Sequence, residues 1–151
     1  MAAMDHPSSS TEPSAVRGPD AEAAIRRDTY RRLIDGFHAS AGAPAEQRWL
    51  WLMAAHVVGQ AQLRLHAASH GTMLGFALQQ RDGREALGQL LRLALVPLGH
   101  ALGRLPAGNV GRATVGAFRP MVPPPPVRAL VDGARSAGPA GRAAGTGAAR
   151  A

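Results

Sequence analysis

The sequence predicts a small all-α domain, and three observations favour this fold class. Apolar residues recur every three or four positions in four successive segments between residues 21 and 96, which is the spacing of amphipathic helices. Short runs containing glycine or proline, such as Gly42-Ala43-Pro44, separate the segments. Residues 105–126 are rich in proline and glycine, which disfavour helix interiors. We therefore expect a bundle of about four helices, followed by an extended C-terminal strap.

The first two helices are expected at about 21–41 and 45–60. Asp20 precedes the first apolar residues and is a suitable N-cap, and Glu46 places negative charge at the start of the second helix. The connection between them is only a few residues long, which is typical of an antiparallel helical hairpin.

The third and fourth helices are expected at about 62–80 and 84–96. On the fourth helix we expect the leucines to face inward and a second stripe to be polar, with a break or kink at Pro97. The expected inward residues are Leu87, Leu90, Leu91 and Leu95, and the polar stripe is Glu85, Gln89 and Arg92.

The C-terminal part should begin with a strap over 105–126, anchored by Phe118 and Met121, and a short helix at about 127–133. Residues 1–20 and 133–151 contain almost no large apolar side chains. Because such segments bury too little surface to offset their conformational entropy, we expect two disordered tails. A single domain over 21–132 remains.

Composition limits the function classes. All 17 basic residues are arginine and the net charge is +7, but few aromatic residues accompany them, which argues against dedicated nucleic-acid binding. There is no cysteine, and hence no disulfide or thiolate metal site. The longest uncharged apolar run, 93–103, is too short to span a bilayer, and we expect no secretory signal. We therefore expect a soluble, cytoplasmic protein, with a protein partner or a homodimer left open.

Histidines form the sharpest pattern. His66 and His70 are four residues apart and lie on one face of the third predicted helix, and His56 lies near the end of the second. Neutral imidazole is a common ligand of divalent metals. Glu85 is a candidate fourth ligand, and Met73 would suit copper(I). Gln60 and Gln89 are candidate supporting residues.

Two other functions remain open. The histidines can instead be internal polar packing within a helical protein-interaction module. A helical-bundle metal enzyme is the third alternative. Such an enzyme usually needs several carboxylates and Glu-x-x-His pairs, and this chain has no Glu-x-x-His pair. Ala67 follows His66, so the HExxH pattern of zinc hydrolases is absent. We therefore expect a non-catalytic accessory protein.

The order of motifs resembles a family of short bacterial helical proteins catalogued only as a domain of unknown function. The resemblance covers about residues 22–130 and also implies that the first hairpin is similar to a tetratricopeptide-type helix pair. The motifs are Ala55-His56-x-x-Gly59-Gln60, His66-x-x-x-His70, Arg81-Asp82-x-x-Glu85-x-x-Gly88-Gln89, Pro106-x-Gly108-Asn109-x-Gly111-Arg112-Ala113 and Phe118-x-Pro120-Met121. The family implies no activity.

Overall fold

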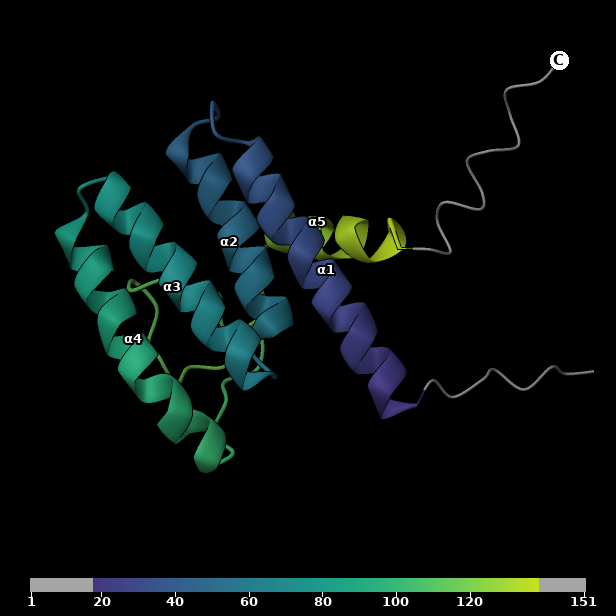
Figure 1. The fold of residues 1–151 in the computed structure, drawn as a ribbon. Coiled ribbons are helices and arrows are strands. Elements are labelled where there is room, and N and C mark those ends of the chain that lie inside the picture. The colour runs from purple at the N-terminus through teal and green to yellow at the C-terminus, as the bar shows by residue number, and fades with distance from the viewer. Residues whose placement is uncertain (1–17, 139–151) are drawn as a thin grey trace, which may run out of the picture.

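Residues 18–138 are described by a computed structural model, and this part of the chain is all-helical, with five α-helices and no strand. The helices are α1 (Pro19–Ala39), α2 (Ala45–Gly59), α3 (Leu63–Gln79), α4 (Gly83–Ala101) and α5 (Pro125–Ser136). The predicted all-α class is confirmed, with five helices in this part of the chain where about four were expected. Helices α1 to α4 lie side by side in chain order, and each packs on the next (Figure 1).

Two apolar clusters form the core. The first joins α1, α2 and α5 around Leu33, Ala55 and Val127. The second joins the other end of the α1–α2 hairpin to α3 and α4 around Trp49, Met73 and Phe76. The aromatic ring of Phe76 meets those of Phe37 and Trp49 at centroid distances of 5.3 and 5.0 Å. Apolar burial of this kind is the main stabilising term of a small domain.

The C-terminal helix is longer than the predicted 127–133. It begins at Pro125, where the fixed φ of proline suits the first helical turn, and it ends at Ser136. Val127, Val131 and Ala134 form its buried face, and Arg32 of α1 donates a hydrogen bond to the carbonyl oxygen of Ala134. This helix therefore takes in the first residues of the predicted 133–151 tail. The rest of that tail, and all but the last residues of the predicted 1–20 tail, lie outside the described residues.

The orientation predicted for α4 was wrong. Leu87, Leu90 and Leu91 are more than half exposed, and Leu95 is only partly buried. The inward face instead carries Glu85 and Gln89, with exposed fractions of 2% and 0%. The polar face points inward because it packs against the strap. The backbone of residues 111–113 needs hydrogen-bond partners there, which leucine cannot provide.

Pro97 does not end α4, which continues to Ala101. Proline removes one backbone donor within a helix, and Pro97 lies on the solvent-exposed side, where water can satisfy the carbonyl group that loses its partner. The extra turn is important for the site below because it carries His100. Asp82 caps the start of α4, as its side chain accepts a hydrogen bond from the N–H of Glu85 at 2.9 Å.

The segment between α4 and α5 crosses the polar face of α4 as a strap of irregular structure (Figure 1). The prediction that Phe118 anchors it was wrong, because this ring is 59% exposed. The anchor is Asn109, which is 2% exposed. Its side-chain amide donates to the carbonyls of Gly116 and Arg119, and its oxygen accepts from the N–H of Gly111.

None of the helices within residues 18–138 has the length and apolar character required to cross a bilayer.

Candidate metal centre

Three buried histidines meet between α2, α3 and the strap. His56 comes from the last turn of α2, and His66 and His70 come from one face of α3. Their exposed fractions are 3%, 7% and 2%. One ring nitrogen from each lies within 4.8 Å of the others. The structure therefore brings together the three histidines that the sequence singled out.

The proton on the His56 ring can be assigned from its partner. Nδ1 of His56 lies 2.9 Å from the backbone carbonyl oxygen of Asn109. Because a carbonyl only accepts hydrogen bonds, Nδ1 must carry the proton and donate it. In the neutral ring, Nε2 is then unprotonated and presents a lone pair.

The same assignment holds for His70, through Gln89. The amide nitrogen of Gln89 donates to Oε1 of Glu85 at 2.8 Å and to the carbonyl of Gly111 at 2.9 Å. These two acceptors fix the orientation of the amide, so its oxygen faces Nδ1 of His70 at 2.7 Å. Nδ1 of His70 therefore donates, and Nε2 of this ring is also unprotonated.

Two lone pairs consequently face each other. Nε2 of His56 and Nε2 of His70 are 3.2 Å apart, and neither can donate to the other while both rings are neutral. A cation between them resolves this repulsion. In a tetrahedral site with zinc–nitrogen bonds of about 2.0–2.1 Å, the ligand nitrogens are separated by about 3.3 Å. The observed separation thus matches the edge of such a site.

Protonation of one ring would also remove the repulsion between the two lone pairs, but burial of the histidines opposes it. Burial is the largest cause that lowers the pKa of His56 well below its ordinary value, and the charges of His70 and His66 lower it further. Burial also lowers the pKa of His66 and of His70 to about 4. Near neutral pH the cluster therefore consists of neutral imidazoles, which is the form that binds metals.

His66 has a partner that the sequence analysis missed. Its Nδ1 lies 3.1 Å from Nε2 of His100, on the last turn of α4. The spacing between these residues gives no hint of the pairing, because it depends on how α3 and α4 pack and on α4 continuing past Pro97. All three imidazoles of the cluster thus have a partner on the nitrogen nearest the backbone.

Glu85 does not join the cluster as a ligand. Its Oε1 accepts hydrogen bonds from Gln89 and from the N–H of Ala113, and its Oε2 lies 3.2 Å from Nε of Arg112. The guanidinium of Arg112 in turn lies over the ring of Trp49, 3.9 Å from its centroid, a favourable cation–π distance. Both carboxylate oxygens are thus engaged, and Glu85 acts by orienting Gln89.

The three supporting candidates, Gln89, Gln60 and Met73, lie in different places. Gln89 contacts His70 directly. Gln60 lines the cavity and, with its amide turned to satisfy both groups, donates to the carbonyl of Pro106 and accepts from the N–H of Gly108. Met73 was misplaced by the sequence analysis, because it is fully buried in the apolar cluster around Phe76 and does not line the cavity.

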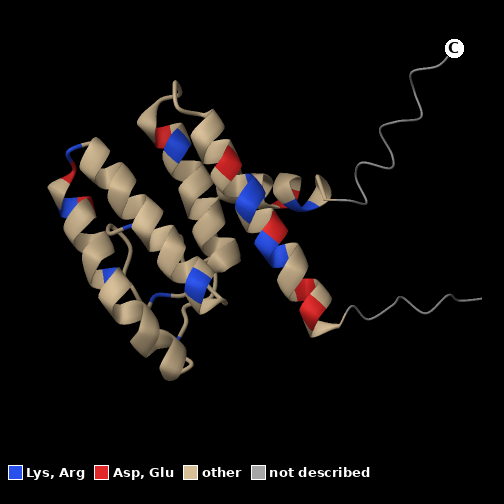
Figure 2. Cartoon of the chain, in the orientation of Figure 1, with Lys and Arg blue, Asp and Glu red and all other residues tan. Residues whose placement is uncertain are grey.

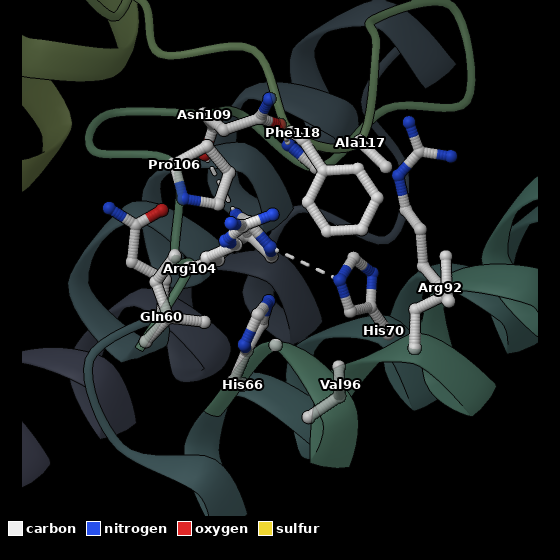
Figure 3. Close-up of a pocket in the computed structure, with 15 residues that line it drawn as sticks. Gln60, His66, His70, Arg92, Val96, Arg104, Pro106, Asn109, Ala117 and Phe118 are labelled. Carbon is white, nitrogen blue, oxygen red and sulfur yellow. Dashed lines mark hydrogen bonds between the residues drawn. The ribbon is translucent and has the colours of Figure 1, made fainter. Parts of the chain in front are cut away.

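The histidines line a cavity of about 40 Å³ (Figure 3). His66 and His70 project into it from α3, Arg92 and Val96 border it from α4, and Phe118 covers it from the strap (Figure 3). The guanidinium of Arg92 donates to the carbonyls of Gly88, Arg112 and Val115, so it ties the strap to α4. A volume of this size holds an ion with a few waters.

The loop at 109–111 closes the cavity against His56. Gly111 has a φ of +79°, and a Cβ at this position would lie 2.8 Å from Cδ2 of His56. Only glycine combines that backbone conformation with so close an approach. The sequence analysis placed Asn109 and Gly111 in the strap and did not predict the contact of this loop with the imidazole.

Comparison with known proteins adds a family but no activity. Residues 23–131 match the family described as "Protein of unknown function (DUF3703)". The chain belongs to this family. No curated protein and no solved structure matches the chain significantly. The match spans all five helices except the first residues of α1 and the last of α5, and it includes every residue of the histidine cluster.

Proposed function

We propose that the protein is a cytoplasmic, non-catalytic metal-binding protein that holds one divalent transition-metal ion on His56, His66 and His70. The observation that carries this proposal is the 3.2 Å separation of two unprotonated Nε2 atoms. The third nitrogen comes from Nε2 of His66, which is left free when Nδ1 donates to His100. The role would be buffering or handing over the ion.

The surrounding hydrogen bonds support the same proposal. Metal-binding histidines usually donate their second ring nitrogen to a fixed acceptor, which sets the orientation of the ring and raises its basicity. Here the acceptors for His56 and His70 are the Asn109 carbonyl and the Gln89 amide oxygen, and His66 has His100 as its hydrogen-bond partner. Because Met73 lies elsewhere, the donor set consists of imidazole nitrogens alone, which favours zinc or copper(II) over thioether-bound copper(I).

The size of the cavity supports a binding role over catalysis. Sites for organic ligands usually occupy about 300–1,000 Å³, whereas the histidines line about 40 Å³. Among residues 18–138, no carboxylate lines the cavity to act as a base, and both oxygens of the nearby Glu85 have partners. We therefore rank a helical-bundle enzyme below a carrier or buffer.

The alternative in which the imidazoles only fill the interior explains the geometry less well. A packed histidine is normally satisfied at both ring nitrogens, and a packing role leaves the two facing lone pairs of His56 and His70 unexplained. A tetratricopeptide-like interaction module built on the α1–α2 hairpin would not require the histidines at all.

The test is a titration of the full chain, purified without a histidine tag and freed of metal by a chelator. Zinc and copper(II) are added in competition with a chromophoric chelator, and we expect one equivalent to bind. His70→Ala should weaken binding by at least about 100-fold, more than the 10- to 100-fold loss typical of an outer hydrogen-bond partner. His66→Ala should act in the same direction.

His38→Ala is the matched control, because His38 is exposed on α1 and outside the cluster. Circular dichroism of each variant verifies that the helices persist. Equal uptake by the wild type and by the His66→Ala/His70→Ala double variant would overturn the proposal.

A further inference from the structure

The outer face of α4 is apolar over about four turns. Leu87, Leu90, Leu91, Leu98 and Leu102 at its end are each more than half exposed, and Ala94, Pro97 and Ala101 on the same side are also exposed. We call this surface the leucine face. It carries no charged residue, and the C-terminal half of α4 is tan in Figure 2, without blue or red. Contiguous apolar surfaces of this kind usually mark an interaction site.

The spacing on the leucine face is that of a helix–helix seam. Residues 87, 91, 94, 98 and 101 follow one another at alternating intervals of four and three, which keeps them on one stripe that can face a second helix. The strap does not cover this stripe, because it crosses the opposite, polar face of α4 through Glu85, Gln89 and Arg92.

Within the sequence, no other segment is suited to cover the face. Residues 1–17 contain only Met1, Met4 and Val16 as larger apolar side chains, and residues 139–151 contain none beyond alanine. Helices α1 and α2 already bury their apolar sides in the core with α5. Residues 1–151 therefore offer no occupant of their own for the leucine face, and a second copy of the chain is the occupant considered below.

The face is complementary to itself when two copies run antiparallel. Residues 87 and 102 are equidistant from a point beside Ala94, and so are residues 91 and 98. An antiparallel pair centred there packs Leu87 against Leu102 of the second copy and Leu91 against Leu98 of the second copy. The small side chain of Ala94 lets the helices approach closely at the two-fold axis. Twofold self-pairing is also the commonest symmetry of soluble oligomers.

The dipole of α4 favours this orientation over a parallel one. The cations nearest to the face are Arg81 and Arg84 at the start of α4 and Arg104 just beyond its end. A parallel pair would bring the two copies of each arginine together. In the antiparallel pair the two copies of Arg84 lie about 30 Å apart, at 1.5 Å per residue, and each lies near Arg104 and the C-terminal carbonyls of the other copy. The opposed dipoles of the two helices, and not the arginines, therefore favour the antiparallel pair.

A groove continues the leucine face at its far end. Its volume is about 530 Å³, and its lining is mostly apolar, with Arg104 as the one charged residue beside Leu98, Leu102, Leu105, Phe118 and Pro120. In the antiparallel pair this groove lies beside the first turn of α4 of the second copy and can receive Leu87. We propose that the leucine face is the interface of a homodimer in which two α4 helices pack antiparallel around Ala94.

The first experiment measures the mass of the full chain in solution by sedimentation equilibrium, in the presence of a chelator so that metal binding has no influence. We expect about twice the chain mass of 15.7 kDa. Leu91→Glu should raise the dimer dissociation constant by about 30-fold or more, which is the effect of an interface hot spot. Ile25→Glu is the control, since Ile25 is partly exposed on α1, at the opposite side of the molecule (Figure 1).

The second experiment remains informative even if Leu91→Glu fails to fold. Because the chain has no cysteine, Ala94→Cys introduces a single thiol next to the proposed two-fold axis. Mild oxidation should link two copies of this variant. Leu87→Cys should not cross-link, because its two thiols would be separated by about 22 Å along the helices, far beyond disulfide reach.

Three results would overturn the proposal. They are a monomer at all concentrations, a dimer that Leu91→Glu leaves unchanged, and cross-linking at position 87 instead of 94. A monomer that floats with phosphatidylglycerol vesicles, and loses this binding in Leu91→Glu, would instead assign the leucine face to a lipid surface.

Discussion

Nε2 of His56 and Nε2 of His70 lie 3.2 Å apart, and each ring donates its Nδ1 proton to an oxygen on its far side. This relationship depends on partners from two separate parts of the chain. Asn109 in the strap orients His56, and Gln89 on α4 orients His70. The account of the site rests on these orientations, and the predictions below examine them one at a time.

Gln89→Met should weaken zinc binding without abolishing it. Methionine is close to glutamine in volume but cannot accept the proton of His70 Nδ1, so the ring loses its fixed tautomer. We expect a 10- to 100-fold loss of affinity, the usual effect of removing an outer partner, with the stoichiometry unchanged. Competition titration measures this. An unchanged affinity would show that Gln89 does not orient the ligand.

Glu85→Gln should destabilise the domain. The carboxylate is 2% exposed and meets Arg112 at 3.2 Å, and its removal leaves that guanidinium without its counter-charge. Breaking a buried ion pair costs about 3–5 kcal/mol. Urea denaturation followed by tryptophan fluorescence gives the free energy of unfolding. Glu46→Gln, at the exposed start of α2, is the control and should change it by less than about 0.5 kcal/mol.

Gly111→Ala should be more harmful than Gly103→Ala. Both glycines have positive φ, at +79° and +63°, but an added Cβ meets the His56 ring at 2.8 Å only at Gly111. Gly103→Ala should cost about 1–2 kcal/mol from its backbone conformation alone. Gly111→Ala should cost more in unfolding free energy and should also weaken zinc binding. Similar losses at the two positions, with zinc affinity intact, would contradict the contact with His56.

The metal-free protein should lose stability as the pH falls below 6.5. In the folded state the pKa of His66 and of His70 is about 4, whereas the ordinary value is 6.5. The unfolded chain therefore binds more protons between these values, and the free energy of unfolding decreases as the pH is lowered through this window. We expect the melting temperature to fall by at least about 5 °C between pH 7 and pH 5.

The control for the pH series is the His66→Gln/His70→Gln double variant, whose melting temperature should depend less steeply on pH over the same window. If the wild type and this variant show the same slope, the histidines are not the groups responsible.

Local patterns allowed much of the fold to be predicted. The bounds of α1, α2 and α3 agree within about two residues, because proline or glycine lies at or near most of their ends. The expected N-cap Asp20 instead lies inside α1. His66 and His70 were found since their spacing on α3 is a local property of a helix, and His56 since it lies near the end of the preceding helix. Contacts that depend on how distant segments pack were not predicted, and the pairing of His66 with His100 is the clearest example.

The inversion of α4 has a more general cause. Hydrophobic periodicity identifies the two faces of a helix but assumes that the apolar one is buried. In this protein the polar face is buried, because the strap presents backbone groups of Gly111 and Ala113 that Glu85 and Gln89 satisfy. The leucine face is therefore exposed in the single chain, which indicates an interaction partner. The proposed dimer supplies that partner.

X-ray absorption at the zinc edge, on the one-to-one complex of the full chain, tests the metal centre most directly. The account predicts three imidazole nitrogens at about 2.0–2.1 Å with the outer-shell scattering of histidine rings, and one further light atom. His70→Ala should reduce the imidazole contribution to two rings. A zinc environment of oxygen atoms alone, or one that contains the sulfur of Met73, would contradict the assignment of the ion to His56, His66 and His70.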